Sequence, residues 1–298
     1  MTKRKWAVLL ILTLLLTTSG CTPDTAYSGT LNVVEASQVG TVYTDNPEVI
    51  VIDARGEEAY AKGHLKGAID LAPSELVDEK SMLIDQVLFE KVVGAKGISS
   101  EKTIYIYDDN DGVNSSRILW SFRVYGHENI MVVNGGASAL VKAGLEITKE
   151  KPSLEAAVYT VKEANPSLMA SYDEMKLQVE QPSDTVKIVD VRSIAEYQAG
   201  YIKGAILYPH TKNLYSDGSF MSSRDIKLFY QDLGLKKEDT ILLYCKSSFR
   251  ATQTFVLLEE AGFTNVKVYD GAWLEWSSKT DVTVPAEEKA PITQQDGS

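Results

Sequence analysis

The stretch Val49-Ile-Val-Ile-Asp53-Ala-Arg55 decides the fold of this chain, because it returns 137 positions later as Val186-Lys-Ile-Val-Asp190-Val-Arg192. The same spacing relates Thr103–Tyr107 to Thr240–Tyr244. Farther along the chain the spacing becomes 136, so the first copy has one additional residue after its second strand-like run. A repeat that persists at nearly constant spacing indicates two copies of one domain.

Each copy alternates short strand-like runs with helical patterns. Runs such as Val49–Asp53 and Val186–Asp190 are rich in β-branched residues, which is typical of buried parallel strands. Residues 251–261 have a helical pattern that stops at Gly262. Strands that alternate with helices predict an α/β fold. We therefore expect two domains, each a mainly parallel sheet flanked by helices.

The repeat also predicts the domain organisation. Two domains of ordinary size fit the length of the chain, and we place them at residues 35–148 and 166–284. Residues 149–165 are charged and less periodic, so we expect the linker there. Residues 285–298 have the composition of a disordered tail.

The first residues have the pattern of a secretory signal. Basic residues at 3–5 precede an apolar run at 6–16, and small residues lead to Cys21. The apolar run is too short to span a bilayer, which takes about 20 residues, although an uncleaved membrane anchor is the alternative. Leu16-Thr-Thr-Ser-Gly-Cys21 resembles the lipobox of bacterial lipoproteins.

That resemblance implies lipidation of Cys21, after removal of residues 1–20 as a signal peptide. Residues 21–34 are then expected to be a tether, because the segment from residue 22 to 30 is small and polar. Two acyl chains suffice for stable anchoring, so the protein is expected to be extracytoplasmic and held at the cell membrane by its lipid anchor only.

The charge of the chain excludes some partners. The formal net charge is −11, and residues 1–20 contain three basic and no acidic residues, so the remainder carries −14. Such an acidic surface argues against binding nucleic acid or anionic lipid by charge. An anionic substrate therefore needs a local positive site.

Cys245 is the candidate nucleophile. The chain has two cysteines, and with Cys21 lipidated Cys245 is an unpaired thiol, which in an exported protein suggests reactivity. An inert core cysteine is the alternative. Cys245-Lys-Ser-Ser-Phe-Arg250, the active loop, follows a strand and precedes a helix, where backbone N–H groups form an anion-binding nest. The helix dipole, Lys246 and Arg250 favour the thiolate form.

Several motifs, in order, resemble the rhodanese family, particularly the two-domain thiosulfate and 3-mercaptopyruvate sulfurtransferases. The resemblance covers roughly residues 35–280. It rests on the active loop and on Asp53-Ala-Arg55, Gly63-His-Leu-Lys-Gly-Ala-Ile69, Tyr125-Gly-His-Glu-Asn129, Asn134-Gly-Gly136, Asp190-Val-Arg192, Gly200-Tyr-Ile-Lys-Gly-Ala-Ile206 and Tyr269-Asp-Gly-Ala-Trp273. Two departures are the absence of glycine from the active loop and Tyr201 in place of the histidine that the first copy keeps as His64.

The resemblance implies that the second domain is catalytic. Cys245 would accept a sulfane sulfur from thiosulfate as a persulfide and pass it to cyanide or a thiol, with 3-mercaptopyruvate as the second-choice donor and no cofactor. The positive loop suits a dianionic donor. Donor binding is assigned to the rest of the loop: Lys246, Ser247, Ser248, Phe249 and Arg250. The first domain is expected to be inactive, because Asp108 stands at the position of Cys245 in an acidic loop.

Other residues receive structural expectations. Asp190 and Arg192 are expected to form an ion pair that supports the active loop, with direct substrate contact as the alternative. Arg250 is expected to bind the donor's oxyanion, with a solvated arginine at the start of the helix as the alternative. The three histidines share no ligand spacing, so we expect no metal site.

Two other functions use the same cysteine. Phosphatases and arsenate reductases of this fold separate cysteine and arginine by five residues, whereas four residues intervene here, which suits sulfur transfer. The other alternative is a surface sulfur carrier or redox-binding protein that loads a persulfide but turns over little with small acceptors. The expected partners are a small sulfur donor and a thiol or cyanide acceptor. We expect no binding of nucleic acid, and we expect the protein to be a monomer.

Overall fold

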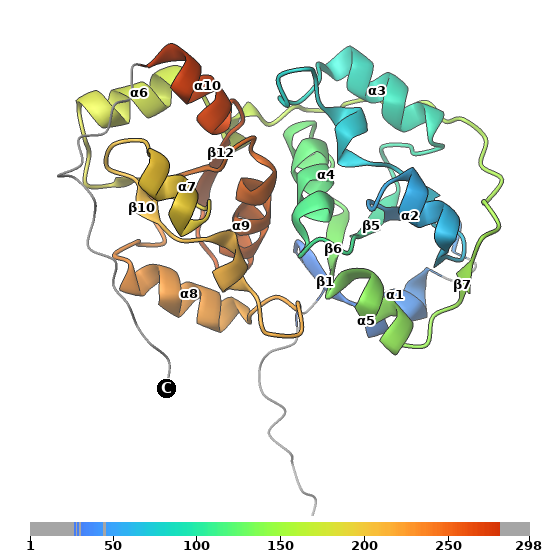
Figure 1. Cartoon of the computed structure of the whole chain (residues 1–298). Coiled ribbons are helices and arrows are strands. Elements are labelled where there is room, and N and C mark those ends of the chain that lie inside the picture. Colours follow the sequence, from blue (N-terminus) through green and yellow to red (C-terminus); the bar gives the residue numbers. More distant parts are fainter. Residues whose placement is uncertain (1–26, 28, 30, 44–45, 281–298) are drawn as a thin grey trace, which may run out of the picture.

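The computed structural model describes residues 27, 29, 31–43 and 46–280, and it contains two α/β domains that lie side by side (Figure 1). The predicted signal peptide, the lipidation site Cys21 and the predicted tail at 285–298 lie outside the described residues. In the part that is described, no helix has the length and apolar character needed to cross a membrane.

The first domain is built on a five-stranded sheet in the order β1-β6-β5-β2-β4, in which every pairing is parallel. A short antiparallel pair, β3 with β7, lies beside it. The strands are β1 Val33–Glu35, β2 Val49–Asp53, β3 His64–Leu65, β4 Ile69–Asp70, β5 Thr103–Tyr107, β6 Ile130–Asn134 and β7 Ile147–Thr148. The helices are α1 Ala36–Val42, α2 Glu57–Lys62, η1 Pro73–Leu76, α3 Gln86–Ala95, α4 Val113–Val124 and α5 Gly136–Lys142.

The second domain repeats this topology in the order β8-β12-β11-β9-β10, again entirely parallel. Its strands are β8 Met169–Ala170, β9 Val186–Asp190, β10 Ile206–Leu207, β11 Thr240–Tyr244 and β12 Asn265–Tyr269. Its helices are η2 Pro166–Leu168, α6 Tyr172–Glu180, α7 Ile194–Ala199, η3 His210–Asn213, α8 Ser223–Asp232, α9 Phe249–Glu260 and α10 Ala272–Lys279. The predicted pair of α/β domains is therefore confirmed.

The central strands place the two corresponding loops. Strand β11 lies between β9 and β12, and Ile241, Leu242 and Leu243 are fully buried because helices cover both faces of a parallel sheet. The carboxyl end of β11 leads directly to Cys245, as the carboxyl end of β5 leads to Asp108. Ligands of open parallel sheets bind at this edge, so the fold puts both loops where ligand chemistry is expected.

The boundary of the predicted tether is wrong. We placed the tether at residues 21–34, but Val33–Glu35 forms strand β1 and pairs with β6, so the first domain begins before residue 35. Tyr27 is also buried, and its hydroxyl donates to the carbonyl of Met221 in the second domain. Burial of the apolar side chains of β1 stabilises this edge strand, because a free tether would leave the same side chains exposed to water.

The segment between the domains lies on the first domain. Residues 149–165, where we expected the linker, contain no helix or strand in this described stretch of the chain. Tyr159 is nevertheless buried and contacts His127, whose Nδ1 is 3.1 Å from the Tyr159 hydroxyl. The Ala157 N–H donates to the carbonyl of Gly94 at 2.9 Å. These contacts fasten the linker to α3 and the loop before β6.

Candidate active site

Cys245 lies at the base of the active loop, directly after β11, and is a free, buried cysteine with 1% exposure. Two backbone hydrogen bonds from the start of α10 hold this end of the loop. The N–H of Trp273 donates to the carbonyl of Cys245 at 2.9 Å, and the N–H of Leu274 donates to that of Lys246 at 3.1 Å. Strand β11 and helix α10 together therefore hold the backbone at Cys245.

The backbone of the active loop has the features of an anion cradle. The backbone N–H groups of Lys246, Ser247 and Ser248 have no acceptor among the residues that the structure describes. Ser248, the residue before α9, has φ 66°, in the left-handed region. Successive N–H groups at such a turn, next to the N-terminus of a helix, converge on a bound anion. The loop can therefore bind an anionic donor and the charged form of the cysteine.

The corresponding loop of the first domain is already occupied by its own side chain. The Asp108 carboxylate accepts hydrogen bonds from the N–H groups of Asn110 (3.0 Å), Gly112 (3.0 Å) and Ser115 (2.7 Å). The Ser115 hydroxyl donates to it at 2.9 Å. Burial raises the pKa of the Asp108 carboxyl above its usual value. The first loop thus has no nucleophile, and its anion cradle is filled.

Asp190 and Arg192 form a buried ion pair beneath the active loop. The Arg192 Nη2 lies 2.6 Å from the Asp190 carboxylate and donates also to the carbonyl of Gly200 at 2.7 Å. The hydroxyl of Tyr244, the residue before Cys245, donates to the same carboxylate at 2.6 Å. The pair thereby holds the end of β11.

The first domain contains the same network without a cysteine above it. Arg55 Nη2 lies 2.6 Å from the Asp53 carboxylate and donates to the carbonyl of Gly63. The Tyr107 hydroxyl donates to Asp53 at 2.7 Å. Because the network recurs in a domain with no nucleophile, it favours a structural role for Asp190 and Arg192 over substrate contact.

The Arg250 guanidinium is paired with a carboxylate of α7. Its Nη1 and Nη2 donate to the carboxylate of Glu196 at 2.7 and 2.8 Å. Hydrogen bonding to Glu196 and the neighbouring Cys245 raise the pKa of Arg250, while burial acts in the opposite direction. Arg250 is thus held by Glu196 of α7 and interacts electrostatically with Cys245, whereas Lys246 is exposed.

Our sequence reasoning missed Glu196. Its one sequence signal is the spacing Ser193-x-x-Glu196, which is typical of a capping box at the start of a helix. The structure contains that capping box at the start of α7. The same carboxylate additionally binds Arg250, and this hydrogen bond is the main cause that lowers the pKa of Glu196 to about 2.

Glu196→Gln is expected to lower the free energy of unfolding by about 1 kcal/mol near neutral pH. Because the folded pKa, about 2, lies below the usual 4.5, the ionised carboxylate stabilises the folded state above pH 4.5. This contribution is lost as the pH falls toward 2. Urea unfolding of both proteins between pH 7 and pH 3 tests this. Glu58→Gln, at an exposed i,i+4 pair with Lys62, is the control and should show no comparable trend. A pH-independent difference for Glu196→Gln would contradict the assignment.

Ser248, which we expected to bind the donor, points away from the cradle. Its hydroxyl lies 2.7 Å from Arg117 Nη1 and 2.9 Å from Asp270 Oδ1, in a buried network between the domains. A serine in the left-handed region costs roughly 1–2 kcal/mol of backbone energy. Hydrogen bonds to two buried charged groups offset that cost, which explains how the loop dispenses with glycine. The Ser248 hydroxyl is therefore held in this network, and donor binding by Ser248 stays a prediction that depends on its backbone N–H.

Tyr201 takes over the packing role of the missing histidine. In the first domain His64 stacks on Tyr60 with ring centroids 3.6 Å apart and an interplanar angle of 6°. In the second domain Tyr201 stacks on Tyr197 at 4.1 Å and 10°. Tyrosine therefore preserves the stacked aromatic pair that histidine makes in the first domain.

The pKa of His210 responds to the charge of Arg250 in the active loop. Burial and the charge of Arg250 lower its pKa. Its Nδ1 is buried and without a hydrogen-bond partner in the described structure. Within the described residues no group of three His, Cys, Asp or Glu side chains is arranged to hold a metal ion.

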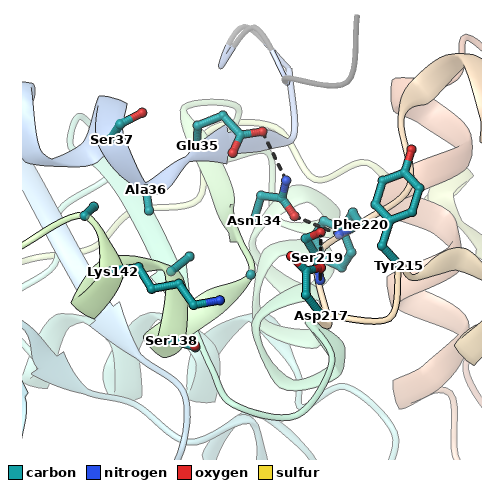
Figure 2. A pocket seen from close by; sticks show the side chains of 13 residues that line it. Glu35, Ala36, Ser37, Asn134, Ser138, Lys142, Tyr215, Asp217, Ser219 and Phe220 are labelled. Carbon is teal, nitrogen blue, oxygen red and sulfur yellow. Dashed lines mark hydrogen bonds between the residues drawn. The ribbon is translucent and has the colours of Figure 1, made fainter. Parts of the chain in front are cut away.

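A cavity of about 620 Å³ lies between the domains on the side of the first loop (Figure 2). Asn134 forms part of its wall, where the side-chain amide donates to Glu35 and accepts from the N–H of Phe220. A second cavity, of about 390 Å³, lies on the other side of the interface and is lined by Leu274, whose N–H binds the active loop, and by Lys80 of the first domain. The residues that line this second cavity include none of the active loop itself.

Comparison with known proteins identifies relatives across both domains. The sequence model of the family described as rhodanese-like domain matches residues 42–143 and 171–279 of this chain. A protein of Saccharopolyspora erythraea, named as a candidate thiosulfate sulfurtransferase, is 34% identical over 245 residues, which are 76% of this chain and 86% of that protein. The sulfur carrier protein TtuD of Thermus thermophilus is 29% identical over 263 residues, covering 81% and 92%.

A solved structure supports the fold. The crystal structure of SseA from Escherichia coli, described as a 3-mercaptopyruvate sulfotransferase, aligns with a TM-score of 0.73 and 24% identity. The alignment covers 82% of this chain and 99% of SseA. At 24% identity this similarity shows only that the two proteins share a fold.

Proposed function

This chain belongs to the rhodanese-like family and is a sulfurtransferase, and we propose that Cys245 carries the transferred sulfur as a persulfide. Thiosulfate is the proposed donor, 3-mercaptopyruvate the second choice, and cyanide or a thiol the acceptor. The reaction needs no cofactor and no metal. We also propose that the protein acts as a monomer outside the cytoplasm, anchored through lipid on Cys21.

The observation that carries this proposal is the contrast between the two loops. In the first loop the Asp108 carboxylate fills the ring of backbone N–H groups. In the active loop the N–H groups of residues 246–248 have no acceptor among the described residues, and Cys245 directly precedes them in the chain. The second loop therefore offers an open cradle and a nucleophile at the same point.

The proposed reaction has two displacement steps. The Cys245 thiolate attacks the outer sulfur of thiosulfate, an S–S bond forms, and sulfite leaves with the electron pair of the broken S–S bond. Cyanide then attacks the outer sulfur of the persulfide, a C–S bond forms, and the thiolate leaves. The loop N–H groups and the nearby Arg250 stabilise the negative charge in both steps.

Thiosulfate is favoured by charge. Lys246 is exposed at the loop, and Arg250, which is paired with Glu196, interacts electrostatically with Cys245, so the loop offers a dianion two cationic side chains. The relative from Saccharopolyspora erythraea is named for the same donor. The likeness of the fold to SseA keeps 3-mercaptopyruvate as the second donor to test.

The test is intact-protein mass of residues 22–298 after exposure to thiosulfate, before and after cyanide. We expect the gain of one sulfur atom, followed by its loss with release of thiocyanate. If thiosulfate adds no sulfur but 3-mercaptopyruvate does, the donor assignment changes. Failure of both donors to load sulfur would refute the persulfide proposal.

The likeness to the sulfur carrier TtuD favours one alternative. A carrier would load sulfur on the same cysteine and deliver it to a partner protein. It would then show stoichiometric loading in the mass measurement but few turnovers with cyanide or small thiols. Steady-state release of thiocyanate at many equivalents per protein distinguishes the proposed enzyme from the carrier.

A further inference from the structure

The first domain reaches the active loop through one buried side chain. Arg117 of α4 is fully buried, and its Nη1 lies 2.7 Å from the Ser248 hydroxyl and 2.7 Å from Asp270 Oδ1. Its guanidinium carbon is 5.3 Å from the centroid of the Phe249 ring. Arg117 thus contacts two consecutive residues of the active loop from the other domain.

These contacts act on the turn that shapes the cradle. Ser248 has its backbone in the left-handed region, and its hydroxyl is bound at once to Arg117 and Asp270. Hydrogen bonds to charged groups are strong and directional in a buried site. Together they hold Ser248 in a conformation that it would otherwise avoid.

The repeat supplies a reciprocal contact that serves as an internal reference. Gln253 of α9, 136 positions after Arg117, donates from its Nε2 to the carbonyl of Asp111 at 2.9 Å. Asp111 belongs to the first loop, which has no nucleophile. Each domain therefore contacts the loop of the other, but only the contact to the active loop is made by a charged side chain.

We propose that Arg117 is a positioning residue for sulfur transfer, through which the inactive first domain sets the conformation of the active loop. This inference rests on the proposed role of Cys245. It assigns the first domain a part in catalysis: without Arg117, Ser248 leaves the left-handed region, and the N–H groups of residues 246–248 lose the arrangement that binds an anion.

The experiment compares Arg117→Met with Gln253→Met, because the two residues are related by the repeat and lie at the same interface. Hydrogen–deuterium exchange of the active loop and of the first loop reads the conformation without reference to activity. For Arg117→Met we expect exchange in residues 246–252 to accelerate at least about tenfold and kcat to fall at least about tenfold, which is about 1.4 kcal/mol. For Gln253→Met we expect faster exchange only near Asp111 and an unchanged kcat.

Arg117→Met leaves Asp270 without its cationic partner, so Arg117→Lys is a second variant that retains the charge. It should fold stably and still lose part of kcat, because lysine lacks the planar guanidinium that stacks near Phe249. The proposal is overturned if Arg117→Lys or Arg117→Met leaves both active-loop exchange and kcat unchanged, or if the Met variants of Arg117 and Gln253 loosen both loops alike. If the wild type transfers no sulfur, the exchange data still decide whether Arg117 holds the loop.

Discussion

Cys245→Ser is expected to abolish sulfur loading and to lower the turnover of thiosulfate and cyanide by at least about three orders of magnitude. A serine hydroxyl is almost entirely protonated at neutral pH and is a poor nucleophile toward sulfur. It cannot form a persulfide. The measurements are intact mass after thiosulfate treatment and steady-state release of thiocyanate, each beside the wild type.

The fold should survive this substitution. Cys245 is buried at the end of β11, and serine is close to it in size, so we expect a change of about 1 kcal/mol in unfolding free energy from burial of the hydroxyl. Circular dichroism and a thermal melt provide the control. Turnover that persists in folded Cys245→Ser would show that the sulfur is carried elsewhere and would remove the central assignment.

Arg192→Met is expected to destabilise the second domain by about 3–5 kcal/mol, because it leaves the Asp190 carboxylate buried without its partner. Arg192 is 2% exposed and Asp190 is fully buried. The Tyr244 hydroxyl and the backbone N–H of residue 192 would still donate to Asp190, but neither of them carries a charge. Urea unfolding, followed domain by domain through exchange of amide hydrogens, measures the loss.

Arg55→Met is the matched control, because Arg55 makes the same contacts with Asp53 in the first domain. If Asp190 and Arg192 are structural, the folded fraction of each variant should retain most of its sulfur transfer. A loss of activity in folded Arg192→Met far beyond that of Arg55→Met would favour substrate contact by Arg192 and contradict the structural reading.

The repeat made most of the fold predictable. Two β-branched runs at constant spacing, each followed by a helical pattern, are local features that one sequence displays. The tether boundary was misplaced because the short strand at Val33–Glu35 gains its stability from pairing with β6, nearly 100 residues away. A three-residue strand carries little signal of its own.

The sequence by itself determined the duplicated α/β fold, the candidate nucleophile Cys245 and the acidic replacement at Asp108, because these depend on residue type and on position relative to a strand end. The tertiary structure alone decided which side chains surround the loop. Glu196 meets Arg250 from α7, and Arg117 meets Ser248 from the other domain, across 131 residues of sequence. Such contacts arise from packing of elements distant in the chain, and hydrogen bonds to buried charges then dictate where each side chain points.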